Sequence, residues 1–300
     1  MIDNTIHYQS CPVCDSTKIH KVLLAKDYTV SHNPYEIWHC EDCSLRFTQD
    51  VPDMQHIGAY YKSEQYVSHT DTQKGLINKL YHIVRERTLK QKLNIIQQAT
   101  GLRQGALLDI GAGVGAFAAQ AKKSGWTITA LEPDADARKV ALHKFGVEAM
   151  PSHELFNIQE KSFDAITLWH VLEHVHQLHA YVESFEKLLK DKGALIIAVP
   201  NYTSFDAQKY RQHWAAYDVP RHLYHFSPAS MKKLMQLHNL QVTQTLPMTY
   251  DSYYVSMLSE KYKRGYNSYT DAFLTGLKSN IHAKRDAENY SSVIYVVKKK

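Results

Sequence analysis

Cysteine is scarce in this chain of 300 residues: it contains four, all between Cys11 and Cys43. A disulfide framework is therefore excluded as the support of the other residues, which must fold around an apolar core. Long hydrophobic runs are also lacking, because none approaches the roughly 20 residues that cross a bilayer. Met1–Asn4 open no charged-then-apolar signal segment. We therefore expect no membrane span and a cytoplasmic location.

Charge of one sign is not in large excess, since the net charge is +5, but it is unevenly distributed. Residues 1–70 contain five Lys and Arg against nine Asp and Glu, whereas residues 201–300 contain 14 against seven. The cysteine-bearing part is therefore acidic and a poor binder of phosphate. This distribution argues against a nucleic-acid partner.

The four cysteines form two Cys-x-x-Cys knuckles with 25 residues between them. Two hairpins can bring such knuckles together around one tetrahedral metal, and zinc is typically held by four thiolates in this way. A redox pair would not need a second copy, and chance clustering is the other alternative. We expect a structural zinc ribbon over residues 1–50, with short strands at 21–24 and 35–39 and a closed site that does no chemistry. Its ligands would be Cys11, Cys14, Cys40 and Cys43.

Residues 51–104 read as a connector followed by a helix. A tyrosine cluster between Tyr60 and Tyr66 is either a packed turn or the rim of a pocket. From Gly75 to about Thr100, apolar residues recur every three to five positions, which predicts an amphipathic helix. The basic residues on its other face are interpreted as solvated charge.

The stretch Ala106–Gly115 is an apolar run that ends in alternating glycines. A buried strand that leads through Gly-x-Gly-x-Gly into a helix is typical of a site where a nucleotide-like cofactor lies against exposed backbone amides. The alternative is a glycine-rich turn that binds no ligand, which would have the same sequence pattern. Strand and helix patterns then alternate, which predicts a parallel α/β sheet. The expected strands are 107–110, 127–131, 147–150, 163–169 and 194–199, and the expected helices are 115–124, 134–145 and 178–190.

Two acids follow the first two predicted strands. Asp109 ends the first, and Glu132 ends the second, 17 residues beyond Gly115. A carboxylate there can accept both hydrogen bonds of a ribose diol. The alternative is an acid that only caps the next helix, but Asp134 already fills that position.

The runs Leu108–Gly115, Leu131–Asp134, Phe163–Ile166 and Trp169–His174 resemble the class I S-adenosylmethionine-dependent methyltransferases. A dinucleotide oxidoreductase would instead favour glycine where Ala116 stands. The resemblance implies a Rossmann-like α/β fold for residues 105–300, with a seven-stranded sheet whose final strand is antiparallel. Residues 241–246 and 293–297 would supply its last two strands.

The resemblance also implies a cofactor site. The methionine part of the cofactor would lie against Asp109, Gly111 and Gly113, and the ribose would bind Glu132. No acid follows the third strand, so adenine would be held by backbone and apolar groups. No Asn- or Asp-Pro-Pro-Tyr run follows the fourth strand, which argues against adenine and glutamine N-methylation. The full expected set is Asp109, Gly111, Ala112, Gly113, Glu132, Pro133, Trp169 and His170.

The segment Trp214–Ser227 is dense in groups that titrate or hydrogen-bond. It resembles a segment of zinc-ribbon-bearing bacterial sugar C-methyltransferases, in which a His-Glu-His-Leu run carries the base. The resemblance places the base at His222, with Arg221 replacing the glutamate, and a cation there would lower the pKa of the base. These residues would otherwise cap the next helix and close the pocket. The other catalytic candidates are His170, Tyr224 and His225.

Residues 201–235 and 250–290 are expected to be insertions on the substrate side. The second is rich in tyrosine and would form either a substrate lid or a homodimer contact. Three functions stay open. The first is methyl transfer from S-adenosylmethionine to a small molecule or saccharide, with a histidine as base. The second is an RNA methyltransferase that docks through its zinc module, and the third is a non-catalytic cofactor-binding protein.

Overall fold

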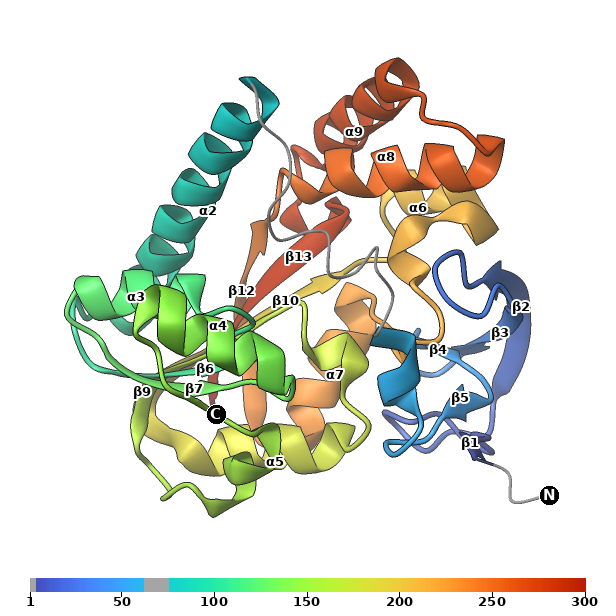
Figure 1. Cartoon of the computed structure of the whole chain (residues 1–300). Helices are drawn as coiled ribbons and strands as arrows, with labels where there is room; N and C mark the ends of the chain where they lie inside the picture. Colours follow the sequence, from blue (N-terminus) through green and yellow to red (C-terminus); the bar gives the residue numbers. More distant parts are fainter. Residues whose placement is uncertain (1–3, 62–75) are drawn as a thin grey trace.

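A seven-stranded sheet runs through the middle of the molecule (Figure 1). The computed structural model describes residues 4–61 and 76–300, with side chains in the second range from residue 86 onward. The expected tyrosine cluster beyond Tyr61 and the expected helix start at Gly75 lie outside the described residues. The strands of this sheet are β6 (Ala106–Ile110), β7 (Thr127–Leu131), β8 (Ala149–Met150), β9 (Phe163–Trp169), β10 (Leu189–Pro200), β12 (Leu240–Pro247) and β13 (Ser292–Lys299).

The strand order is β12-β13-β10-β9-β6-β7-β8. Strands β6 to β10 pair in parallel, whereas β13 pairs antiparallel with both β10 and β12. The predicted seven-stranded α/β sheet with an antiparallel final strand is therefore confirmed. All five parallel strands end at the same edge, which is where open α/β sheets bind their ligands.

Helices cover both faces of the sheet, because successive strand residues point to opposite sides. Leu107 packs with Ile96 and Phe117 in one buried cluster, and Leu108 packs with Phe185 and Met231 in another. The first cluster lies under α2 (Leu76–Thr100) and α3 (Ala116–Lys123), and α4 (Ala135–Phe145) packs beside α3. The second lies under α5 (Leu178–Leu188) and α7 (Pro228–Leu237).

Several predicted boundaries were wrong. The helix expected to reach residue 190 ends at Leu188, and β10 begins at Leu189 rather than Ala194. Leu189 has an extended backbone and pairs with Phe163 before a bulge, so tertiary pairing overrides the local helical pattern. The third parallel strand is limited to Ala149–Met150. Asp134 does cap α4, where its side chain accepts a hydrogen bond from the Ala137 amide.

The N-terminal part forms a small antiparallel sheet of its own. Its strands are β2 (Ile19–Lys26), β3 (Pro34–Cys40) and β4 (Arg46–Thr48), and β1 (Thr5–Ile6) pairs with β5 (Val51–Pro52) nearby. A short strand from the other end of the chain, β11 (Tyr224–His225), completes this sheet at its β4 edge. The cysteine-bearing part therefore shares a sheet and a core with the segment that was expected to face substrate.

The C-terminal helices pack together above the sheet edge. They are α6 (Phe205–Tyr210), α8 (Asp251–Arg264) and α9 (Tyr269–Ala283), and Asp206 at their centre accepts hydrogen bonds from Trp214, Ser279 and Ser291.

The short 3-10 turns are η1 (Ile57–Tyr61), η3 (Ser152–Asn157), η4 (Leu172–His174), η5 (Arg211–His213), η6 (Ala215–Tyr217) and η7 (Ala287–Asn289).

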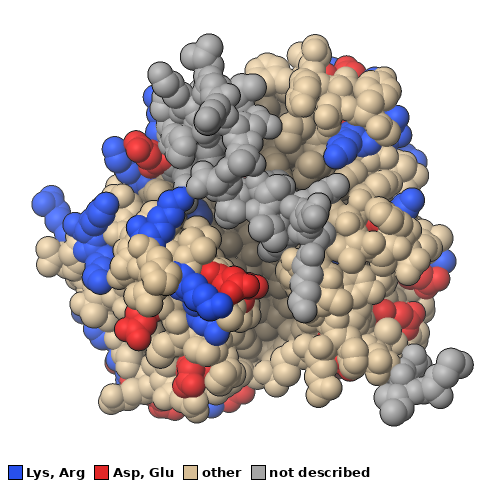
Figure 2. Space-filling model, viewed as in Figure 1, with Lys and Arg blue, Asp and Glu red and all other residues tan. Residues whose placement is uncertain are grey.

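The outer surface carries both charges. Lys and Arg side chains gather over α3 and α4 on the face shown in Figure 2, with acidic side chains next to them. The described part of this face therefore lacks the uniform basic stripe typical of nucleic-acid-binding proteins. Across the described ranges, no helix is both long and apolar enough to cross a membrane.

Candidate active site

The glycine loop leads from β6 into α3, and all three of its glycines have positive φ. A Cβ on Gly111 would lie 2.4 Å from the Cγ2 of Val171, so this glycine lets the loop pack against the turn after β9. A Cβ on Gly113 would meet no heavy atom within 4 Å in the described structure. Gly113 therefore leaves an open side on which a ligand can lie against the backbone.

Asp109 is buried at the end of β6, and its carboxylate accepts a hydrogen bond of 2.7 Å from the Thr167 hydroxyl. Burial raises the pKa of Asp109 to about 6, against the opposing effects of Thr167 and Lys92. Lys92 reaches the same place from α2, with its ammonium 4.4 Å from the centre of the Trp169 ring. Burial lowers the pKa of Lys92. A carboxylate and a cation thus flank the start of the glycine loop.

Glu132 is buried at the end of β7 and is held by two backbone amides. Its Oε2 accepts from Gly113 at 2.8 Å, and its Oε1 accepts from Asp134 at 3.0 Å. Burial raises the pKa of Glu132, although both amide hydrogen bonds oppose that shift. Sequence reasoning missed the bond to Gly113, which ties the glycine loop to β7. Each carboxylate oxygen retains a lone pair for a further donor.

The neighbouring expected residues support this loop through their backbone. The amide of Ala112 donates to the Leu131 carbonyl at 3.0 Å, which continues the pairing of β6 with β7. The carbonyl of Pro133 accepts from Arg138 at 2.8 Å. Trp169 lies at the end of β9, edge-on to Phe117 with ring centres 5.7 Å apart. These residues surround the glycine loop, and their contacts to a cofactor stay predictions.

His170 follows β9 and lies between two carboxylates. Its Nδ1 is 3.3 Å from Glu173, and its Nε2 is 2.9 Å from Asp251 at the start of α8. Burial alone would lower the pKa of His170, but the two carboxylates outweigh it and raise the pKa to about 10. The two carboxylates therefore favour the protonated ring of His170 at neutral pH, which suits it less than a neutral histidine to the role of a base. Its catalytic role stays a prediction.

His222 lies in the segment between α6 and α7 and is largely buried. Its Nδ1 is 2.8 Å from the Ala216 carbonyl oxygen, and its own carbonyl accepts from the Thr48 hydroxyl at 2.7 Å. A carbonyl oxygen only accepts, so the hydrogen of the neutral ring is on Nδ1 and the lone pair is on Nε2.

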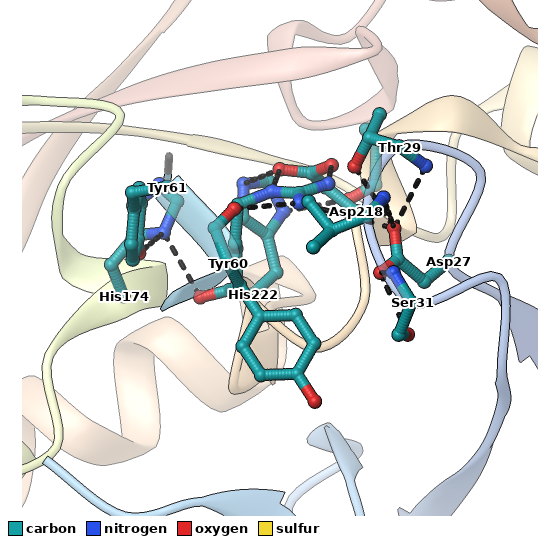
Figure 3. A network of polar contacts seen from close by, with 11 residues as sticks. Asp27, Thr29, Ser31, Tyr60, Tyr61, His174, Asp218 and His222 are labelled. Carbon is teal, nitrogen blue, oxygen red and sulfur yellow. Dashed lines mark hydrogen bonds and ion pairs between the residues drawn. The ribbon is translucent and has the colours of Figure 1, made fainter. Parts of the chain in front are cut away.

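Arg221 is not a free cation beside His222. Its guanidinium binds both carboxylate oxygens of Asp218 and donates to the Tyr60 carbonyl at 3.1 Å. Asp27, which accepts hydrogen bonds from Thr29 and Ser31 (Figure 3), lies 3.9 Å from the guanidinium. The side chain that replaces the glutamate of the resembling family thus anchors the segment to the N-terminal part.

Tyr224 and His225 lie in β11, within the ribbon sheet. His225 Nε2 is 3.0 Å from the Thr48 hydroxyl, and the ring is edge-on to Tyr217. Burial holds the pKa of His225 well below its usual range. Tyr224 is buried, and its hydroxyl donates to the His176 carbonyl at 3.4 Å. A catalytic role for either stays a prediction, and their observed contacts join the ribbon to the sheet domain.

Glu173 and His174 are residues whose importance sequence reasoning missed. Both follow β9 in η4, and the His174 ring lies 4.6 Å from the His222 ring, centre to centre. The sequence feature that could have indicated them is an acid and a histidine a few residues beyond a buried parallel strand, where ligands of open α/β sheets bind. Nothing local in the sequence indicates that His222, 48 positions later, lies beside them.

The four cysteines converge as expected. The sulfur atoms of Cys11 and Cys43 are 3.5 Å apart and those of Cys14 and Cys40 are 3.6 Å apart, and all four lie within 4.8 Å of one another. Zn–S bonds of about 2.3 Å in a tetrahedron require a sulfur separation of about 3.8 Å. The donor set and spacing therefore fit zinc, which these four residues would hold.

A family model described as a methyltransferase domain matches residues 81–245, which is more than half of the chain. The chain belongs to this methyltransferase family. Similar curated proteins include an uncharacterized methyltransferase of Alkaliphilus oremlandii, 29% identical over 42% of this chain and 57% of its own length. A ubiquinone biosynthesis O-methyltransferase of Xanthomonas oryzae is 25% identical over 53% of this chain and 72% of its own length. The chain thus spans about half to three quarters of these methyltransferases.

Solved methyltransferase structures share the fold. Magnesium protoporphyrin IX methyltransferase from Synechocystis superposes with a TM-score of 0.54 at 14% identity, over 83% of this chain and all of that one. Geranyl diphosphate C-methyltransferase from Streptomyces coelicolor gives 0.52 at 14% identity, over 77% and 88%. The expected methyltransferase fold is confirmed.

Proposed function

We propose that this methyltransferase transfers the methyl group of S-adenosylmethionine to an oxygen of a small-molecule or saccharide acceptor. The observation that carries the proposal is the open side of Gly113 next to the buried carboxylate of Glu132. A ligand with a ribose diol can lie against that backbone while its hydroxyls donate to Glu132.

The methionine part of the cofactor, which carries an ammonium and a carboxylate, is assigned to the side of the glycine loop near Asp109 and Lys92. Asp109 offers a carboxylate to the methionine ammonium, and Lys92 offers an ammonium to the methionine carboxylate. Both groups are already desolvated, so an ion pair with the ligand costs little further burial. Trp169 would cover the ligand from the β9 side.

His222 is assigned the role of the general base that accepts the proton of the acceptor hydroxyl. Its Nε2 carries the lone pair because Nδ1 donates to Ala216, whereas the carboxylates of Glu173 and Asp251 favour the protonated form of His170. As the acceptor oxygen attacks the methyl carbon, its proton passes to Nε2 and the carbon–sulfur bond breaks. The electron pair stays on sulfur, which leaves the neutral thioether S-adenosylhomocysteine.

An oxygen acceptor is supported by the ubiquinone biosynthesis O-methyltransferases among the relatives. The small-molecule class is supported by the mixed charge of the surface and by the acidic N-terminal part. Zinc in the four-cysteine site is assigned a structural role, because four thiolates leave no open coordination position.

The test of the acceptor class is incubation with methyl-labelled S-adenosylmethionine and separated pools of small molecules, polysaccharide, lipid, protein and RNA. We expect label in the small-molecule or polysaccharide pool. Label in RNA alone would contradict the proposal. Tight cofactor binding without label in any pool would identify a non-catalytic protein.

Replacing His222 by Ala should lower turnover by roughly 10²- to 10⁴-fold, because a general base typically contributes that much. The affinity for S-adenosylmethionine should change less than about threefold, since the glycine loop and Glu132 are untouched. Single-turnover kinetics and calorimetry measure the two quantities. His143→Ala is the matched control, because His143 is exposed in the last turn of α4 and lies outside both segments. Equal losses of turnover and affinity would refute the base assignment.

A further inference from the structure

A row of large apolar side chains lies exposed along α9. Tyr269, Phe273, Leu277 and Ile281 recur every four residues and are between 36% and 65% exposed. Residues four apart lie on the same side of a helix, so these side chains form one continuous row about 18 Å long. Leu274, which is 46% exposed, widens the row. These five side chains are called the α9 stripe below.

The opposite face of α9 is fixed to the rest of the molecule. Gly276 packs so closely against α8 that a Cβ on it would lie 2.7 Å from the Cδ1 of Tyr253. The Ser279 hydroxyl donates to the buried Asp206 of α6 at 2.7 Å. Figure 1 shows α9 at the top of the molecule, next to α8. The stripe therefore belongs to a helix that is already held in place, and a partner would need to order little of the backbone on binding it.

The exposed area of the stripe is large enough for an interface. At these exposures its five residues present on the order of 600 Å² of surface, which is the upper end of the largest apolar patch on a typical monomer. A standard protein interface buries about 800 Å² on each partner. The stripe together with a polar rim therefore provides the area that one stable protein–protein contact requires.

Charged residues beside the stripe make it complementary to a second copy of itself. Asp271 and Lys278 are exposed and seven residues apart, so they lie two turns apart on one flank of the stripe. Their midpoint almost coincides with the midpoint of the stripe, which is at the level of Thr275. A two-fold axis at that level makes two α9 helices antiparallel and brings Asp271 of each copy next to Lys278 of the other.

The same axis pairs the apolar side chains. Tyr269 of one copy lies opposite Ile281 of the other, and Phe273 lies opposite Leu277. Rows of residues four apart on two helices commonly interdigitate in this way. Asp271 also binds Arg264 of its own chain through Oδ2 at 2.8 Å, and a carboxylate can accept hydrogen bonds from several donors.

We propose that the α9 stripe is the interface of a two-fold symmetric homodimer, in which two α9 helices pack antiparallel and Asp271 pairs with Lys278 of the second copy. The contact uses no residue assigned to the cofactor or the acceptor, so it does not depend on the proposed function. A membrane surface is the competing partner. The acids Asp271 and Asp286 alternate with the basic residues Lys278 and Lys284 along this segment, whereas helices that bind membrane surfaces carry mainly Lys and Arg on the polar face.

The first test measures the mass of the zinc-loaded full chain by sedimentation equilibrium at concentrations up to about 100 µM. We expect a species of twice the 34.5 kDa mass of the chain. Ile281→Asp should weaken association at least tenfold, because it buries a charge in the apolar part of the interface. Leu142→Asp is the matched control, since Leu142 is a half-exposed apolar residue of α4 outside the stripe. Thermal unfolding verifies that each variant is folded.

The second test uses the two charges. Lys278→Asp places like charges opposite each other in the dimer, and so does Asp271→Lys, so each variant alone should associate about tenfold more weakly. In an equimolar mixture, one chain of each kind restores both ion pairs. The mixture should therefore associate more tightly than either variant alone.

A monomer at every concentration, or equal association by folded Ile281→Asp, would overturn the inference. A monomeric chain that sediments with vesicles of phosphatidylcholine and phosphatidylglycerol would also overturn it, and would identify the stripe as a membrane-binding surface. A mixture of the two charge variants that associates no more tightly than either alone would refute the antiparallel arrangement.

Discussion

Removing the metal from the four-cysteine site should abolish methyl transfer, not only unfold the ribbon. Structural zinc contributes on the order of 10 kcal/mol of folding free energy in small zinc modules. The ribbon edge holds the segment of the proposed base directly, because Thr48 donates its amide hydrogen to the Leu223 carbonyl and its hydroxyl hydrogen to the His222 carbonyl. The Ser44 carbonyl also accepts from Tyr202 and Ser227. Loss of the ribbon would therefore release His222.

The measurement compares zinc-loaded protein, chelated protein and the Cys40→Ser variant. Zinc content, hydrogen exchange of β11 and turnover are followed together. Lys18→Ala is the control on the same module, because the ion pair of Lys18 with Asp42 is exposed to solvent and contributes little to stability. If the zinc-free protein kept full turnover while the amides of β11 exchanged freely with solvent, the proposed dependence of the His222 segment on the ribbon would be contradicted.

Substituting alanine at two neighbouring glycines should separate folding from cofactor binding. Gly111→Ala places a methyl group 2.4 Å from Val171 at a φ of +67°, so we expect a loss of about 2–5 kcal/mol of unfolding free energy. Gly113→Ala has open space and a φ of +54°, so its cost should be about 1 kcal/mol. Its methyl group, however, stands where the cofactor is assigned, and the affinity for S-adenosylmethionine should fall roughly 10- to 100-fold.

Urea denaturation and calorimetry distinguish the two effects. The double variant Gly111→Ala/Val171→Ala removes the clash and should recover part of the stability, as expected for coupled neighbours. If folded Gly113→Ala bound the cofactor as tightly as the unaltered chain, the open side of Gly113 would not be the binding surface.

Much of the sheet domain could be predicted because its signals are local. The strands at 127–131 and 163–169 were predicted to the residue, and Asp134 is the helix cap that its position indicated. Buried parallel strands are apolar runs of strand length, and caps and glycine turns depend on a few adjacent residues. The class of cofactor site followed from those same local features.

The parts that could not be predicted depend on contacts between distant residues. β11 has two residues and no periodicity, yet it pairs with β4 some 177 positions earlier in the chain. That pairing turns His225 and Tyr224 toward the ribbon. The state of His170 likewise depends on Asp251, which arrives from α8. The neighbourhood of Glu173 depends on the return of the chain at His222. No residue pattern within a single helix or strand predicts these long-range contacts.

The glycine loop and Glu132 are proposed to bind S-adenosylmethionine, and calorimetric titration with S-adenosylhomocysteine measures that binding directly. We predict one site per zinc-loaded chain. Glu132→Gln should weaken binding roughly 10- to 100-fold, as expected for loss of charge-assisted hydrogen bonds of about 1.5–3 kcal/mol. Glu148→Gln, which alters an exposed carboxylate nearby in sequence, should bind normally. Absence of binding by the folded chain, or equal binding by folded Glu132→Gln, would contradict the proposed cofactor site.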